Sequence, residues 1–251
     1  MDKSKIATAL LIACIAILLL LHVFFSSWIT AATTYISIAF MFVSVLTGIY
    51  AFRIHGVDSV QGKIILALTG FAVFDFLGFL TWEAYDFFEL GKPIVSAGDT
   101  FWILGYVLAV WGISMIPEIS KKQFSGVGKA AVGIGWAVLA CMLIYASYTF
   151  LKDTELSPVE IMLSLGYFAL DVFILGMLLR GMVSVWGTSF INGWVIIFLS
   201  FLALAAGDVL YTFNTSITAE SIANFAWMIQ SVFIAFGFYI YRAKIEALAK
   251  K

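Results

Sequence analysis

Residues 64–85 read IILALTGFAVFDFLGFLTWEAY, an unbroken apolar stretch that holds Asp75 near its middle. A helix needs about 20 mostly apolar residues to cross the hydrocarbon core of a bilayer, and this stretch meets that length. Its apolar residues run continuously and do not alternate with polar ones, which is typical of a helix and not of a barrel strand. The stretch therefore predicts a membrane-spanning helix that carries a carboxyl group.

Seven further stretches of the same kind lie along the chain, and only short segments separate them. The eight predicted spans cover residues 6–28, 33–53, 64–85, 99–116, 129–151, 159–179, 190–213 and 221–241. We therefore expect an all-α, multi-pass membrane protein of eight transmembrane helices, folded as a single integral membrane domain in the lipid bilayer.

The composition of the 251 residues agrees with that expectation and excludes several other classes. Hydrophobic residues make up 63% of the chain and charged residues 12%, whereas a soluble domain carries about 25% charged residues. The net charge of −1 gives no reason to expect a nucleic-acid partner. Cys14 and Cys141 lie in apolar stretches without the spacing of metal ligands, and there are two histidines, so we expect neither a metal nor a cofactor.

The distribution of positive charge predicts the orientation of the spans. With the N-terminus inside, all of the 14 Lys and Arg residues except Lys92 and Lys152 fall in the inner segments. Because Lys and Arg gather on the cytoplasmic side of membrane proteins, we expect both termini to be cytoplasmic and the protein to lie in the plasma membrane.

Two parts of the chain resemble each other, which indicates an internal duplication. The stretch SAGDTFWILGYVLAVWG at residues 96–112 aligns without gaps with SIANFAWMIQSVFIAFG at residues 221–237. One span earlier, Asp75 corresponds to Asp208, and Arg53 near the end of the second span corresponds to Arg180 in the sixth. Four helices return the chain to its starting side, so the predicted halves, residues 1–125 and 126–251, would form a parallel repeat about an axis along the membrane normal.

Three carboxyl groups, those of Asp75, Asp171 and Asp208, lie inside predicted spans, and Glu83 lies near the outer end of the third. A carboxylate at the centre of a bilayer costs about 2.5–3.5 kcal/mol on insertion scales, so such residues are usually functional or well partnered. No Lys or Arg lies in the interior of a span to pair with them. Three interpretations stay open: hydrogen bonds that hold the helices together, a ligand or ion site between the halves, and a proton relay.

Aromatic residues of the fourth, sixth and eighth spans could donate hydrogen bonds to these acids. The predicted ligand-binding residues are Asp75, Asp208, Asp171, Glu83, Trp102, Tyr106, Tyr167 and Trp227. Asp99, three residues after Ser96 at the start of the fourth span, is instead typical of a helix cap.

The arrangement of these residues resembles the eight-span sensory modules at the N-termini of bacterial and archaeal diguanylate cyclases and histidine kinases. The positions that match the patterns of that family are Asp75, Ser96, Asp99, Phe101, Trp102, Gly105, Tyr106, Tyr167, Asp171, Asp208, Leu210, Tyr211 and Trp227. The chain departs from the family at Phe168, where a proline is usual, and at Asn224, where an acid is frequent.

This resemblance implies a sensory or ligand-binding membrane module that binds a small-molecule or cationic ligand and signals to a cytoplasmic partner. No kinase or cyclase domain follows Lys251, so the expectation is a module that stands alone. The alternative is a small secondary transporter or ion-coupled carrier that uses the intramembrane carboxylates. We expect no enzyme activity and no catalytic residues, because the surroundings of Asp75 and Asp208 lack the motifs of an aspartyl intramembrane protease.

Overall fold

The computed structural model describes residues 3–24, 26–91, 93, 95–120, 126–152, 157–188, 191–213 and 217–249. Within these residues the secondary structure is helical, and the helices have the following bounds: α1 Lys3–Phe24, α2 Ser26–His55, α3 Val60–Phe87, α4 Ala97–Ser114, α5 Ile116–Ser120, α6 Gly126–Lys152, α7 Pro158–Val185, α8 Ile191–Phe213 and α9 Ile217–Ala249. Eight spans in this part of the chain are long and apolar enough to cross a membrane. The prediction of an all-α protein with eight candidate transmembrane helices is confirmed.

The fourth span consists of α4 and the short α5, because the helix breaks at Met115, two residues before Pro117. Proline has no backbone N–H and cannot continue the hydrogen-bonding pattern of a preceding turn. The backbone N–H of Met115 closes α4 on the carbonyl oxygens of Gly112 and Ile113. The new helix then packs against α7, where a Cβ on Gly181 would lie 3.1 Å from the Cβ of Ile116. This contact explains why α7 extends to Val185, beyond the predicted end at residue 179.

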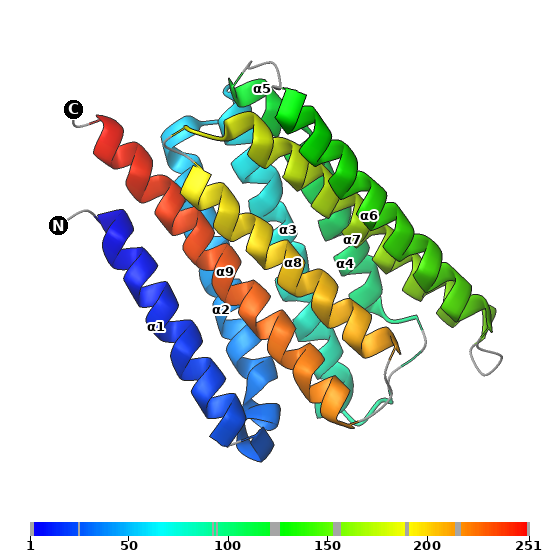
Figure 1. The fold of residues 1–251 in the computed structure, drawn as a ribbon. Helices are drawn as coiled ribbons and strands as arrows, with labels where there is room; N and C mark the ends of the chain where they lie inside the picture. The colour runs from blue at the N-terminus through cyan, green and yellow to red at the C-terminus, as the bar shows by residue number, and fades with distance from the viewer. Residues whose placement is uncertain are drawn as a thin grey trace.

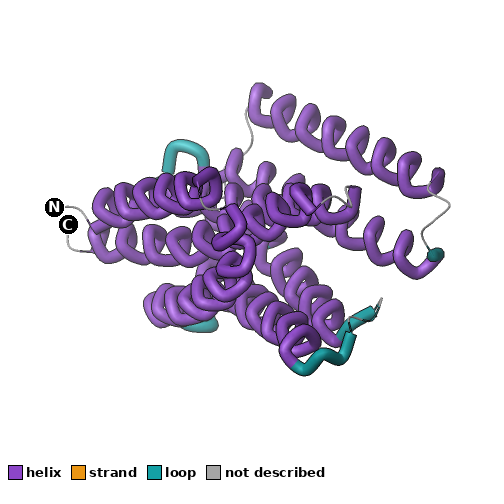
Figure 2. The backbone as a smooth tube through the Cα atoms, turned by 90° about the horizontal axis from the view of Figure 1, so that it is seen from below, coloured by secondary structure: helices purple, strands orange, loops and turns teal. Residues whose placement is uncertain are grey.

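The helices form one bundle in which α1 and α6 occupy opposite edges (Figure 1). The most buried spans belong to α3, α8 and α9, with α3 packed along α4 and α8 along α9. The last helix also contacts α2 and α1. Seen from below, α6 stands apart from the centre of the bundle (Figure 2). The N- and C-termini lie at the same end of the bundle (Figure 1).

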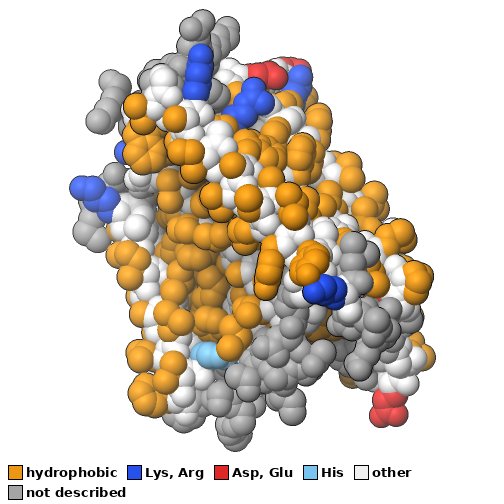
Figure 3. Space-filling view, turned by 45° about the vertical axis from the view of Figure 1, so that its right-hand side comes forward, with side chains coloured by type: hydrophobic (Ala, Val, Ile, Leu, Met, Phe, Trp, Pro, Cys, Tyr) orange, Lys and Arg blue, Asp and Glu red, His pale blue; other side chains and the backbone are white. Residues whose placement is uncertain are grey.

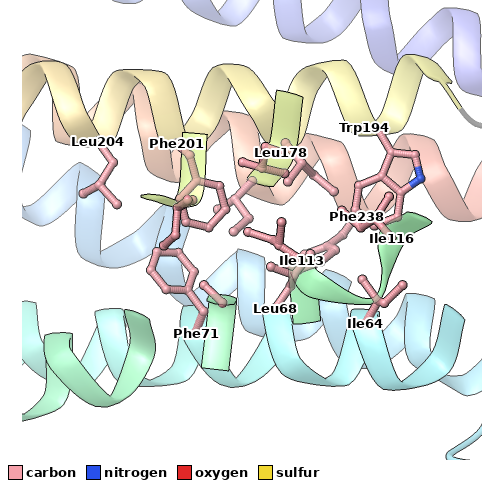
Figure 4. Packing of buried hydrophobic residues seen from close by; sticks show 14 of the residues in the cluster. Ile64, Leu68, Phe71, Ile113, Ile116, Leu178, Trp194, Phe201, Leu204 and Phe238 are labelled. Carbon is pink, nitrogen blue, oxygen red and sulfur yellow. The ribbon is translucent and has the colours of Figure 1, made fainter. Parts of the chain in front are cut away.

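The hydrophobic core lies where α3, α5, α7, α8 and α9 meet (Figure 4). Its largest fully buried side chains include Trp194, Phe201 and Phe238. Glycines on α4 and α9 allow close approach to this core, since a Cβ on Gly112 would lie 2.7 Å from the Cβ of Ala67. Small residues at helix contacts are the usual means by which membrane helices pack tightly.

The outer surface is apolar around the middle of the bundle. Hydrophobic side chains cover the middle of the face in Figure 3, and most of the visible Lys and Arg lie toward its upper end. In α6 the most apolar stretch has none of its residues buried. An exposed apolar belt with charges toward the ends suits a protein surrounded by lipid.

Candidate functional site

The hydroxyl of Tyr106 on α4 joins two carboxyl groups that come from α7 and α8. It lies 2.6 Å from Oδ1 of Asp171 and 3.0 Å from Oδ2 of Asp208. Tyr106 is 3% exposed and Asp171 is 2% exposed, whereas Asp208 is half-buried. Three helices therefore converge on one phenol oxygen inside the bundle.

A second donor reaches Asp208 from α9. The indole Nε1 of Trp227 donates a hydrogen bond of 2.8 Å to Oδ1 of Asp208. The indole ring fits there because Gly207, the residue before Asp208, has no side chain; a Cβ at that position would collide with Nε1 of Trp227. Tyr211, one turn further along α8, also packs against this indole, with its ring centroid 5.5 Å from that of Trp227.

Asp75 on α3 has a different set of partners. Its Oδ2 accepts a hydrogen bond of 3.1 Å from the side-chain amide of Gln230, and the indole of Trp102 also lies within hydrogen-bonding reach. Trp102 packs against Gly78, where a Cβ would meet the indole nitrogen. Gln230 lies one turn after Trp227, so α9 supplies a donor to each of the two corresponding acids.

We call these side chains together the acid cluster. Its members are Asp75, Asp171, Asp208, Trp102, Tyr106, Trp227 and Gln230. Two of its buried oxygens, Oδ2 of Asp171 and Oε1 of Gln230, have no hydrogen-bond partner among the described residues. Buried polar atoms in proteins normally find a partner, so these two acceptors indicate where a ligand or a proton would bind.

Tyr167 approaches the cluster from α7 through the cap of α4. Its hydroxyl donates a hydrogen bond of 2.8 Å to Oδ1 of Asp99. Asp99 and Ser96 form a capping box in which each side chain bonds the backbone N–H of the other residue. The predicted capping role is confirmed, and the same carboxyl group also bonds a neighbouring helix.

The structure brings together seven of the eight predicted site residues, six in the acid cluster and Tyr167 beside it. Glu83 is the exception, because it lies two turns beyond Asp75 on α3, about 12 Å along the helix axis. Gln230 is not among the eight predicted site residues, and the structure places its side-chain amide on Asp75. Its polarity within an apolar span was the signal in the sequence.

Two further observations concern metal binding and the position of a pocket. Among the described residues, no group of three or more His, Cys, Asp or Glu side chains is arranged to hold a metal ion. A pocket of about 480 Å³ lies elsewhere, on α6, where it is lined by Ile134, Ala137, Val138, Cys141, Met142 and Tyr145. This pocket is apolar and lies on the edge helix, which suits a lipid chain better than a polar ligand.

Comparison with protein families, with curated proteins and with solved structures found no match to the chain.

Proposed function

We propose that the chain is an integral membrane sensory or ligand-binding module that signals to a separate partner. The observation that carries this proposal is the acid cluster, in which carboxyl groups from three spans lie together on donors from two others. Such residues are costly within a membrane and usually mark a functional site. The resemblance to eight-span sensory modules favours the same function.

A duplication of four helices is part of the proposal, and matched contacts in the two predicted halves support it. In the first half Gly112 packs on Ile64 of α3, and in the second half Gly237 packs on Ile197 of α8. Each tryptophan also donates toward the acid of the preceding span, Trp102 to Asp75 and Trp227 to Asp208.

The contacts between the halves match as well, which also supports the duplication. Ser44 and Asp171 stand at equal distances before Arg53 and Arg180, and Ser231 aligns with Tyr106. The Ser44 hydroxyl donates to the backbone oxygen of Ser231 at 3.2 Å, whereas Tyr106 bonds the Asp171 carboxyl at 2.6 Å. The contact between α2 and α9 thus has two serines where the contact between α4 and α7 has a tyrosine and an acid. The proposed ligand site therefore lies at the contact that contains the acid.

Helix α9 is a suitable connection between the site and the end of the bundle that holds the termini. Gln230 contacts the acid cluster, and Arg242 lies about 18 Å further along the same helix. There Arg242 forms a salt bridge of 2.8 Å with Glu246 and stacks on the ring of Tyr50 of α2. Lys3 of α1 approaches Glu246 at 3.8 Å. A shift of α9 would therefore change its contacts with two other helices.

The proposed orientation places this end of the bundle in the cytoplasm and the protein in the plasma membrane. The excess of Lys and Arg in the segments on that side supports the orientation. A partner protein would then meet the ends of α2 and α9. A reporter fused after Lys251 that is active only in the cytoplasm tests this placement, and activity of an export-dependent reporter there would contradict it.

Distances between spin labels can test the sensory function. The labels would be placed at Ile54 and Leu248, which are exposed near the ends of α2 and α9, after Cys14 and Cys141 are changed to alanine. We expect D208N to change the distance between the labels in bilayers, because it removes the carboxyl group that Tyr106 and Trp227 contact.

The matched control for this experiment is E160Q. Glu160 caps the start of α7 and lies outside the acid cluster, so its replacement should leave the label distance unchanged. An unchanged distance in D208N, with the protein folded, would contradict signalling through α9.

A secondary transporter or ion-coupled carrier is the second candidate, because carboxyl groups at a contact between repeats are common in carriers. Sealed vesicles separate the two functions. A carrier would give proton or sodium flux that is lost in D208N, whereas a sensory module would give none above empty vesicles.

A further inference from the structure

The Tyr106 hydroxyl makes two close contacts with carboxyl oxygens but has only one hydrogen to donate. Its hydroxyl lies 2.6 Å from Oδ1 of Asp171 and 3.0 Å from Oδ2 of Asp208. A hydroxyl has a single hydrogen, so it can donate to only one of the two oxygens. The other contact is a hydrogen bond only if the carboxyl group carries a hydrogen and donates it to the phenol oxygen.

The contact between the two carboxyl groups also favours a bound hydrogen, which can occupy either this contact or the one to Tyr106. Asp171 and Asp208 lie within hydrogen-bonding reach of each other, and two carboxylates have no hydrogen to place between them. Oδ2 of Asp171 is buried and accepts from no donor among the described residues. Oδ1 of Asp208, in contrast, accepts from the indole of Trp227 at 2.8 Å. These partners suit a carboxylate at Asp208 and a carboxylic acid at Asp171.

The groups around Asp171 and Asp208 also favour a bound hydrogen, because several of them are acids. Asp208 on α8 is near enough for its charge to act on Asp75, and the charges of Asp75, Asp99 and Asp208 all act on Tyr167. These neighbouring groups are acids, so they supply no positive charge. One hydrogen shared between Asp171 and Asp208 reduces the charge of the pair to that of a single carboxylate.

The spacing leaves room for a proton and for nothing larger between these groups. Distances of 2.6 to 3.0 Å are those of direct hydrogen bonds, without an intervening atom. The described residues also contain no cluster arranged to hold a metal ion.

We propose that Asp171 and Asp208 bind one proton between them, together with Tyr106, and that this proton is the ligand of the site. The inference deepens the proposed function, because it names what the module detects. The proton enters as a bond between hydrogen and one carboxyl oxygen, and it leaves to water as the pair becomes two carboxylates.

Infrared spectroscopy of the chain in lipid nanodiscs at neutral pH can detect this proton. A protonated carboxyl group has a C=O stretching band that shifts in D₂O, and a carboxylate lacks that band. We expect D171N and D208N each to remove the band of the pair, because the acid that remains then accepts from an amide and Tyr106 and becomes a carboxylate. The double variant D171N/D208N should lose no more of the band than either single variant.

A different pattern would overturn the proposal. Two independently protonated acids would make the double variant lose twice the intensity lost by each single variant, and two carboxylates would give no loss in any of them. The matched control is E160Q, because Glu160 lies on α7 like Asp171 but outside the acid cluster. In the E160Q background the loss caused by D208N should be unchanged.

A third variant keeps the test informative if an asparagine variant does not fold. In Y106F the two carboxyl groups can still share the proton directly, but the protonated carboxyl group loses its hydrogen bond to the phenol oxygen. The band should therefore remain and move to higher frequency, and an unmoved band would contradict the role of Tyr106. The spin-label experiment does not depend on this band, so the failure of one test can be distinguished from the failure of the other.

Discussion

Tyr106 and Asp208 are 102 residues apart in the sequence, and their side chains meet at 3.0 Å inside the bundle. The contact joins α4 to α8, and the bond from the same hydroxyl to Asp171 adds α7. One phenol group thus connects helices from both predicted halves. Its loss should therefore affect the stability of the bundle.

Replacing Tyr106 by phenylalanine is expected to lower the free energy of unfolding by about 1–2 kcal/mol, because two buried carboxyl groups lose a hydrogen-bond partner. Equilibrium unfolding in mixed micelles, followed by circular dichroism, measures the change. The control is Y145F, since Tyr145 is 71% exposed on α6 and should tolerate the loss of its hydroxyl. Equal stability of the two variants would contradict the assignment.

The glycine next to Asp208 provides a second prediction. In G207A the new Cβ would collide with the indole nitrogen of Trp227 and push the ring away from Asp208. We expect a loss of about 1–3 kcal/mol in the free energy of unfolding, together with a shift in tryptophan fluorescence. G133A is the control, because a Cβ on Gly133 of α6 meets no atom within 4 Å. Its stability should equal or slightly exceed that of the wild type.

The two capping boxes allow a matched comparison. Ser96 and Asp99 cap α4, and Ser157 and Glu160 cap α7 in the same way. Asp99 also accepts the interhelical hydrogen bond of Tyr167. We therefore expect D99A to destabilise the protein more than E160A does, by about 1 kcal/mol.

A double-mutant cycle of D99A with Y167F should give a coupling energy equal to the extra destabilisation of D99A over E160A. Additive effects in the cycle would show that the Tyr167 bond contributes nothing to stability.

The proposed duplication predicts that equivalent glycines are equally sensitive. A Cβ would lie 2.7 Å from the Cβ of Ala67 in G112A and 2.8 Å from Cγ1 of Ile197 in G237A. Both variants should lose about 1–3 kcal/mol, because each contact is too close for an added methyl group. Unfolding measurements in which only one variant is destabilised would argue against equivalent packing in the two halves.

The predicted spans followed from the sequence because the bilayer imposes a local requirement. Each span needs a continuous apolar stretch, and stretches such as residues 64–85 and 129–151 show it without reference to any other part of the chain. The capping role of Ser96 and Asp99 was also visible, since both partners lie within one turn of the same helix.

The sequence alone did not determine which donor meets which acid. The spans are apolar on every side, so their sequences give little information about which face of a helix points inward. Asp75 could have met Tyr106 or Trp227 as readily as Gln230. Only the rotation and packing of the helices brought Tyr106 to Asp171 and Asp208, because these contacts join residues far apart in the chain. The sequence therefore determined which acids lie within apolar spans, and the tertiary structure decided that two of them meet at one hydroxyl.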